Sequence, residues 1–266
     1  ANRKAMEKAL TKVKAMLGNE YPLVIGGEEI RTDDKLKSIN PSQPNEVVGV
    51  FSKANPDLAI KAIETAAEKF EEWKWTDPKK RADYIFKAAK LMRQRKHEFS
   101  AVMIYEVGKT WPEADADTAE AIDFLEFYAR EILRYSGKQP ITKIPSEKNE
   151  LCYIPLGVGV ILPPWNFALA ILTGMTSAAI VTGNTVVLKP SSDSPLTGWM
   201  FFNLMREVGL PAGVINFMTG SGSTIGDVLV AHPKTRFVSF TGSKEVGIQI
   251  NELASKVQPG QKWLKR

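Results

Sequence analysis

The sequence predicts an α/β protein: a Rossmann-like parallel sheet with helices on both faces, preceded by a helical N-terminal region and a β-hairpin. Two observations favour this fold class. From residue 158 onwards, short runs rich in β-branched residues alternate with helical patterns, which is typical of right-handed βαβ crossovers in a parallel sheet. Before residue 138, most apolar residues recur at helical spacing. A chain of 266 residues can bury a large core, in one large domain or two ordinary ones.

Residues 1–137 are expected to be mainly helical, with one early β element. The first helix is indicated by apolar residues at helical spacing, namely Met6, Leu10, Val13 and Leu17. Gly18 is a natural stop for this helix. The stretch PLVIGGEEI, residues 22–30, reads as two short strands around a Gly-Gly turn.

Further helices are predicted from their capping residues. Asn55-Pro56 and Asp77-Pro78 each combine an N-cap residue with a proline at the first helical position, and an amphipathic helix follows each pair. A longer helix is predicted over residues 118–137, ending at Gly137. Its apolar face is expected to contain Ile122, Leu125, Tyr128, Ala129 and Ile132. Residues 138–157 then read as two short strands around a polar turn.

The parallel sheet is expected to contain four strands, at residues 158–162, 185–189, 214–218 and 236–240. Helices are predicted near residues 167–181, 195–208, 223–231 and 244–255. Ligands of such sheets bind beyond the carboxyl ends of the strands. The residues that directly follow each strand, which we call the strand exits, are therefore the candidates for function.

The four strand exits read PPWNF, KPSSDSP, TGSGSTIG and TGSKEVG. Three of them bring glycine, serine or threonine to the start of a helix, where free backbone N–H groups favour phosphate. Lys189 is the only cation directly at a strand end and suits ribose hydroxyls or phosphate. The segment with Gly220, Gly222 and Gly226 misses the dinucleotide fingerprint by one residue, so on its own it is either a nucleotide site or an ordinary turn.

Several other site classes are excluded by the sequence. VGKT, residues 107–110, has no glycine at position 103 and is therefore not a Walker-type phosphate loop. No G-x-S-x-G hydrolase elbow is present. Two histidines and one cysteine do not supply a usual zinc site.

The charge distribution argues against a nucleic-acid partner. The first 15 residues carry five basic side chains and one glutamate, and the last 11 carry four basic side chains. The rest of the chain therefore has a net charge of −3, although the whole chain has +5. A nucleic-acid binder would instead gather lysine and arginine on a folded face.

A membrane or secreted protein is not indicated either. The most apolar stretch, residues 158–181, is interrupted by Pro163, Pro164 and Asn166, and the N-terminus reads as a charged helix rather than a signal peptide. The single cysteine, Cys152, excludes internal disulfides and favours a reducing, cytoplasmic location.

Taken together, the exits identify a family that no single exit could. The order PWNF, LKPS, GSGS and FTGS resembles the cofactor-binding half of an aldehyde dehydrogenase, and the resemblance covers nearly the whole chain. Within this superfamily, FLEFYAREILRYSG and YIPLGVGVILPPWNFALAI are most similar to the 1-pyrroline-5-carboxylate dehydrogenases. The resemblance implies NAD(P)-dependent oxidation of glutamate 5-semialdehyde to glutamate in proline catabolism.

The resemblance also implies a domain organisation. Residues 1–137 would form the helical N-terminal part of the cofactor-binding domain, residues 138–157 a hairpin for oligomerisation, and residues 158–266 the nucleotide-binding part. The family's nucleophilic cysteine and general-base glutamate lie in a catalytic domain that would follow residue 266. We therefore interpret Cys152, in an expected strand, as a packing residue. A homodimer or higher homo-oligomer is expected for the full-length protein.

Asn166 would be the catalytic side chain in this chain. In the family, the asparagine of PWNF donates its amide N–H to the oxyanion that forms when the thiolate attacks the aldehyde. Judged by spacing alone, Asn166 is equally suited to cap the next helix. Trp165 and Phe167 would close the substrate pocket against water, or would be plain core aromatics.

The resemblance places the cofactor along the other exits. Leu162, Pro163 and Trp165 would lie along it, and Lys189 would contact the adenosine ribose unless it is an ordinary surface lysine. Gly222 would lie beneath the adenine end, Gly242 and Ser243 would meet the pyrophosphate, and Val246 would pack on adenine. Ser192 stands where many members have a glutamate that repels a 2′-phosphate, so NADP is a possible cofactor beside NAD.

Two hypotheses follow for function. Either the chain is the N-terminal half of an aldehyde-oxidising enzyme, acting on glutamate semialdehyde or on another aldehyde, or it is a nucleotide-binding fragment without chemistry of its own.

Overall fold

The computed structural model describes residues 2–266. The helices are α1 (Asn2–Lys14), α2 (Pro56–Trp73), α3 (Pro78–Gln94), α4 (Lys96–Val107), α5 (Trp111–Tyr135), α6 (Ala170–Val181), α7 (Pro195–Glu207), a π-helical turn η1 (Gly222–Gly226), α8 (Asp227–Ala231) and α9 (Lys244–Ser255). The strands are β1 (Glu20–Tyr21), β2 (Leu23–Ile25), β3 (Glu28–Ile30), β4 (Lys35–Ile39), β5 (Val47–Ser52), β6 (Val158–Leu162), β7 (Thr185–Leu188), β8 (Ile215–Phe217) and β9 (Thr235–Phe240).

The main sheet has the strand order β3-β2-β8-β7-β6-β9, and the four strands β6 to β9 are parallel. The predicted parallel sheet is therefore confirmed. The predicted Gly-Gly hairpin also forms, as β2 and β3, and it pairs antiparallel with β8 at Val24 and Phe217. The side-chain carbonyl of Asn216 fastens the turn by accepting a 2.8 Å hydrogen bond from the N–H of Gly26. Segments far apart in the sequence thus share one sheet.

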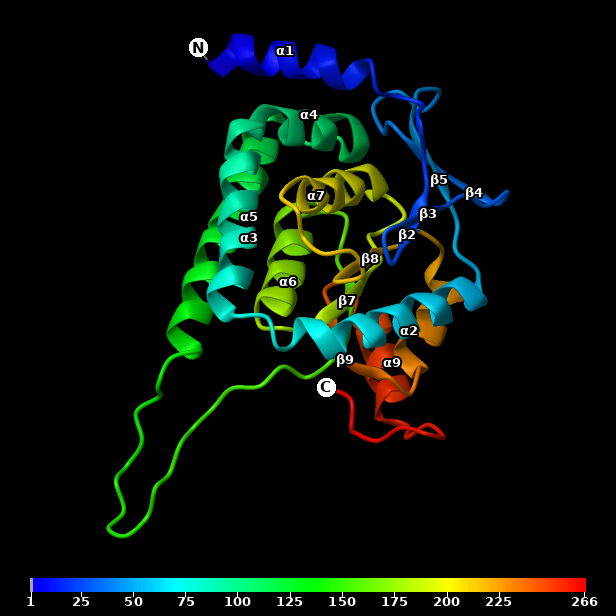
Figure 1. The fold of residues 1–266 in the computed structure, drawn as a ribbon. Coiled ribbons are helices and arrows are strands. Elements are labelled where there is room, and N and C mark those ends of the chain that lie inside the picture. Colours follow the sequence, from blue (N-terminus) through cyan, green and yellow to red (C-terminus); the bar gives the residue numbers. More distant parts are fainter. Residues whose placement is uncertain (1) are drawn as a thin grey trace.

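Helices cover both faces of this sheet, as predicted (Figure 1). Adjacent residues of β6 and β7 point into different clusters: Ile161 and Val186 join the core beneath α6 and α7, whereas Val160 and Val187 join a second core. Helices α2 and α8 supply the other side of that second core, with side chains such as Ile63. Because both faces are covered, the strands are apolar throughout rather than alternating.

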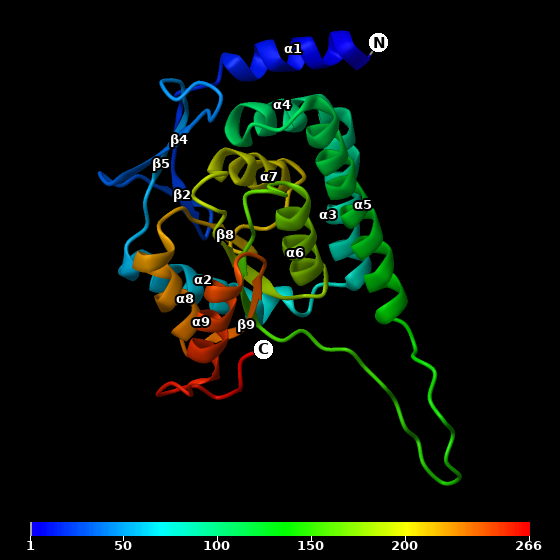
Figure 2. The ribbon, with the colours of Figure 1, turned by 180° about the vertical axis from the view of Figure 1, so that it is seen from behind.

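Helices α1, α3, α4 and α5 form a further layer on the outer side of α6 and α7. Helices α3 and α5 run alongside α6, and α1 runs alongside α4 on the outside of the layer (Figures 1 and 2). The predicted caps are present: Asn55 accepts a hydrogen bond from the N–H of Leu58, and Asp77 from that of Lys79. The ring N–H of Trp73 donates to the carbonyl of Ile180 and so connects the end of α2 with α6.

Some elements differ from their predicted extents. Helix α5 begins at Trp111, before the predicted residue 118, because Thr110 and Glu113 form a capping box there. Its predicted face is buried except at Tyr128, which is partly exposed. Helix α6 begins at Ala170 rather than near 167. A second small sheet, β1-β5-β4, was not predicted, since β1 has two residues and β4 carries two lysines.

The segment 138–157, which we call the arm, corrects two expectations. It extends away from the body and returns (Figures 1 and 2), but it contains no strand. A two-stranded hairpin without a third strand or a packed face is only marginally stable, which explains why the two legs stay unpaired. Cys152 lies on this arm and is exposed, so the interpretation of Cys152 as a packing residue is wrong.

None of the helices within residues 2–266 combines the length and apolar character that a membrane crossing needs.

Candidate functional site

The four strand exits meet in one cavity of about 880 Å³. The strand order β8-β7-β6-β9 explains this, because the chain runs outward from β6 to β8 and then crosses to the opposite side for β9. Such a switch in strand order leaves a crevice at the carboxyl ends of β6 and β9, the two strands on either side of the switch. The cavity is lined by all of the predicted site residues except Phe167: Leu162, Pro163, Trp165, Asn166, Lys189, Ser192, Gly222, Gly242, Ser243 and Val246.

The glycines of the strand exits shape the cavity wall in two different ways. A Cβ atom at Gly222 would meet no atom within 4 Å, so packing within the protein does not require glycine there and a ligand can approach the backbone closely. At Gly242, in contrast, packing does require glycine, because a Cβ atom there would lie 2.5 Å from the Phe240 ring. Ser243 caps the twelve-residue helix α9 by accepting from the N–H of Val246, and this helix start faces the cavity. These features suit a dinucleotide with its phosphates at α9.

Lys189 is buried, with 8% of its surface exposed, so the alternative of a surface lysine is wrong. Burial lowers the pKa of Lys189. Within residues 2–266 its ammonium has no anionic partner, and its one hydrogen bond, to the carbonyl of Pro190, is long at 3.4 Å. A buried ammonium group with unused N–H donors is suited to donate hydrogen bonds to oxygen atoms of a ligand in the cavity.

Ser192 lines the cavity, and so does its neighbour Asp193. The sequence pattern singled out Ser192 but not Asp193, because the family resemblance places the acidic residue at position 192. An acidic side chain is therefore present at this end of the cavity, one residue later than expected.

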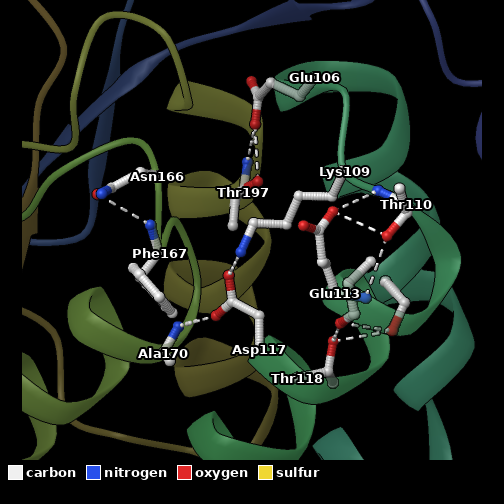
Figure 3. Close-up of polar contacts among 12 residues, drawn as sticks. Glu106, Lys109, Thr110, Glu113, Asp117, Thr118, Asn166, Phe167, Ala170 and Thr197 are labelled. Atoms are coloured by element: carbon white, nitrogen blue, oxygen red, sulfur yellow. Dashed lines mark hydrogen bonds and ion pairs between the residues drawn. The ribbon is translucent and has the colours of Figure 1, made fainter.

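Asn166 lies in the turn between β6 and α6, and its side-chain carbonyl oxygen already accepts a hydrogen bond (Figure 3). This oxygen accepts from the N–H of Phe167 at 3.2 Å, while the side-chain NH₂ group donates to no partner within residues 2–266. Asn166 does not cap α6, since that helix has no capping bond from its own N-cap residue, and Asp117 of α5 accepts from the N–H of Ala170 instead. The amide of Asn166 is thus free to donate to a ligand.

Trp165 and Phe167 are both about half exposed, so neither is a core aromatic. Trp165 and Asn166 line the large cavity and also a second one, of about 420 Å³, which contains Phe167. The PWNF turn therefore separates two cavities, with the free amide at the boundary between them.

The second cavity is acidic, and the sequence pattern did not indicate it. Lys109 is its one basic lining residue, and it pairs with Asp117 at 2.5 Å. Glu113 accepts from Thr110 in the capping box. Glu120 also lines the cavity, and within residues 2–266 its carboxylate has neither an ion pair nor a hydrogen bond. These carboxylates come from α5, which is remote in sequence from the strand exits.

Comparisons with known proteins agree with this geometry. The family model described as "Aldehyde dehydrogenase family" matches residues 29–262. A 1-pyrroline-5-carboxylate dehydrogenase of Geobacillus sp. (strain WCH70) is 58% identical over the whole of this chain and 52% of its own length. That of Anoxybacillus flavithermus is 57% identical over the same shares. The chain spans about half the length of the curated relatives it matches.

Solved structures show the same fold. A Thermus 1-pyrroline-5-carboxylate dehydrogenase with bound NAD matches with a TM-score of 0.96 and 48% identity, over 99% of this chain and 51% of that one. Proline utilization A from Bdellovibrio bacteriovorus matches with a TM-score of 0.98 and 39% identity, over 100% of this chain and 28% of that one.

Proposed function

The chain belongs to the aldehyde dehydrogenase family, and we propose that it holds the cofactor and the oxyanion donor for NAD(P)-dependent oxidation of an aldehyde to a carboxylic acid. The observation that carries this proposal is the convergence of the four strand exits on one cavity, with the free amide of Asn166 at its boundary with a second cavity. The nucleophile and the general base would lie in the part of the full-length relatives that this chain does not cover.

The large cavity would hold NAD, and a relative's structure with bound NAD supports this choice. Gly242 and Ser243 would bind the pyrophosphate at the start of α9, and Lys189 would donate to ribose hydroxyls. Val246 would pack on the adenine, with Gly222 beneath it. When bound, NAD supplies the hydride acceptor of the reaction.

Leu162, Pro163 and Trp165 would guide the cofactor towards the PWNF turn. There the aldehyde oxygen would gain negative charge as the nucleophile attacks, and the Asn166 N–H would donate to that oxygen. A fixed neutral donor of this kind contributes about 3 kcal/mol to the transition state, a rate factor of about a hundred.

The second cavity would hold the aldehyde, with Phe167 on its wall. We propose glutamate 5-semialdehyde as the substrate, supported by the names of the most similar relatives. The unpaired Glu120 suits the ammonium group that this aldehyde carries, and an uncharged aliphatic aldehyde would leave it unused. Ranking a panel of aldehydes by kcat/KM in the full-length protein tests the choice, and a preference for uncharged aliphatic aldehydes would reject it.

The role of Asn166 is tested by Asn166→Ala in the full-length protein. We expect kcat to fall about a hundredfold while the Kd for NAD barely moves, since the lost hydrogen bond exists only in the transition state. The matched control is Asn45→Ala in the exposed loop between β4 and β5, which should change neither value. Equal losses in cofactor binding and turnover would instead assign Asn166 to the fold.

The cofactor preference depends on position 192. We expect measurable turnover with NADP in the wild type, because Ser192 offers no charge against a 2′-phosphate and Lys189 attracts it. Ser192→Glu should then raise the preference for NAD. A wild type without NADP turnover would contradict this expectation, and recovery of NADP turnover by Asp193→Asn would identify Asp193 as the excluding group.

A further inference from the structure

The segment 106–117 joins the end of α4 to the start of α5 and includes the VGKT stretch, for which the sequence suggested no role. The short connection between the two helices has a fixed backbone on both sides. Gly108 ends α4 in the left-handed conformation, with φ of 68°, and Thr110 begins α5 with a capping box. The segment is therefore a firm support for the side chains that it projects towards α6 and α7 (Figure 3).

Asp117 holds the start of α6. It is 2% exposed, and one carboxylate oxygen accepts from the N–H of Ala170, the first residue of α6, at 2.6 Å. The other oxygen accepts from Lys109 at 2.5 Å, and the Lys109 ammonium stands 4.9 Å from the centre of the Phe167 ring. Asp117 thus caps a helix that has no side-chain cap of its own. Residues 163–169, which lead into this helix, are the turn that presents Asn166.

Glu106 holds the start of α7 in the same way. It is 3% exposed and accepts from the backbone N–H groups of Leu196 at 2.6 Å and Thr197 at 2.8 Å. The hydroxyls of Thr197 and Ser38 complete its partners, at 2.7 and 3.1 Å. Helix α7 also lacks a capping bond from its own N-cap residue. The loop 189–194, which leads into α7, presents Lys189 and Ser192.

Both contacts place a carboxylate against unpaired N–H groups at the positive end of a helix, which is a favourable arrangement. Both carboxylates come from the N-terminal helical layer, whereas both helices follow central strands of the parallel sheet. Neither Glu106 nor Asp117 is needed to close its own helix, because Gly108 and Thr110 do that. Their partners follow the exits of β6 and β7, which carry Asn166 and Lys189.

We propose that Asp117 and Glu106 are two separate positioning residues: Asp117, supported by Lys109, fixes the turn that presents Asn166, and Glu106 fixes the loop that presents Lys189 and Ser192. The kinetic part of this inference rests on the proposed function. Its structural part, the holding of two helix starts, does not.

The test compares Asp117→Asn and Glu106→Gln in the full-length protein. For Asp117→Asn we expect kcat to fall about tenfold or more, with the Kd for NAD unchanged within about twofold, because a small misplacement of the oxyanion donor affects only the chemical step. For Glu106→Gln we expect the opposite split, a Kd for NAD raised about tenfold and a kcat at saturating NAD that is nearly unchanged. Matched controls are Asp123→Asn, exposed on α5, and Glu98→Gln on α4, which changes the ion pairs with Lys12 and Arg95 but touches neither helix start; both should behave as wild type.

A second readout does not depend on catalysis. Amide hydrogen exchange should rise at Ala170 in Asp117→Asn and at Leu196 and Thr197 in Glu106→Gln, with each helix start affected by its own variant only. If Asp117→Asn fails to fold, Lys109→Gln replaces it, and if Glu106→Gln fails to fold, Thr197→Val replaces it. Each replacement should change the same quantity, kcat or the Kd for NAD, by a smaller factor.

The outcomes separate the two ideas. Equal effects of both variants on kcat and on the Kd for NAD, or unchanged exchange at the two helix starts, would overturn the positioning roles. A wild type that oxidises no aldehyde contradicts the proposed function alone. The exchange measurements and the Kd for NAD then still decide whether Asp117 and Glu106 hold their helices.

Discussion

The Glu106 carboxyl is enclosed by β4, α4 and α7, and this environment changes its acidity. Burial raises the pKa of Glu106 to about 7, and the hydrogen bonds from Thr197, Leu196 and Ser38 offset only part of that rise. Burial also raises the pKa of Tyr21 in β1, and the charge of Glu106 adds to this rise. The protonation state of a helix-holding residue therefore changes close to neutral pH.

This acidity predicts a pH dependence of stability. The folded pKa, about 7, lies above the ordinary value of 4.5, so between these values the folded state binds a proton that the unfolded state has lost. The stabilisation from this proton is fully present below about pH 4.5 and is lost as pH rises to about 7, by about 3 kcal/mol in total. Glu106→Gln should remove this slope. Urea unfolding of both proteins at several pH values measures it, and parallel curves would contradict the prediction.

At the residue scale, the strand exits were predictable and the helix-holding carboxylates were not. Leu162, Lys189, Gly222 and Gly242 could be grouped from sequence because parallel strands bring their carboxyl ends to one edge. Asp117 meets Ala170 across 53 residues, and Glu106 meets Leu196 across 90. No local pattern encodes such a contact, since it depends on how the N-terminal helices pack against the sheet.

At the element scale, the arm shows where local sequence reasoning fails. Its two legs have the composition of strands, but strands need a partner, and the arm finds none within residues 2–266. Its apolar side chains are correspondingly exposed: Ile141, Ile144, Leu151, Tyr153 and Ile154. We propose that the arm pairs with a second copy of the full-length protein, as the family resemblance implies.

Ile154 provides the test of this assembly, since 80% of its surface is exposed. Ile154→Glu should weaken a dimer of the full-length protein by about a thousandfold in Kd, because a two-fold interface buries the side chain twice and each burial stabilises by about 2 kcal/mol. Analytical ultracentrifugation across a dilution series measures the dissociation. Lys148→Gln, a polar change on the same arm, should leave the dimer intact, whereas an unaffected dimer in Ile154→Glu would exclude the arm from the interface.

At the scale of the whole molecule, residues 2–266 contain some of the groups that the proposed reaction needs. The cavity proposed for the cofactor and the side-chain amide proposed as the oxyanion donor are both present. An activated nucleophile and a proton acceptor beside it are also required. The single cysteine lies on the exposed arm, away from the residues that line the cavity.

We therefore expect residues 1–266, prepared alone and confirmed by mass, to oxidise no aldehyde while still binding NAD weakly. A dehydrogenase assay that follows NADH production, together with a cofactor titration, checks both parts. Aldehyde-dependent NADH production that disappears in Cys152→Ala would overturn the expectation and assign Cys152 to catalysis.

The pairing of β2 with β8 has a consequence for how the molecule reaches its native state. Val24 and Phe217 are sheet neighbours, although about three quarters of the chain lies between them. Bringing such distant segments together costs loop-closure entropy before the contact stabilises anything, and folds rich in non-local contacts form slowly. During synthesis on a ribosome, the N-terminal hairpin emerges early and has to wait for β8. Until then β2 presents an unpaired apolar edge, and this interval is when the chain is most exposed to aggregation.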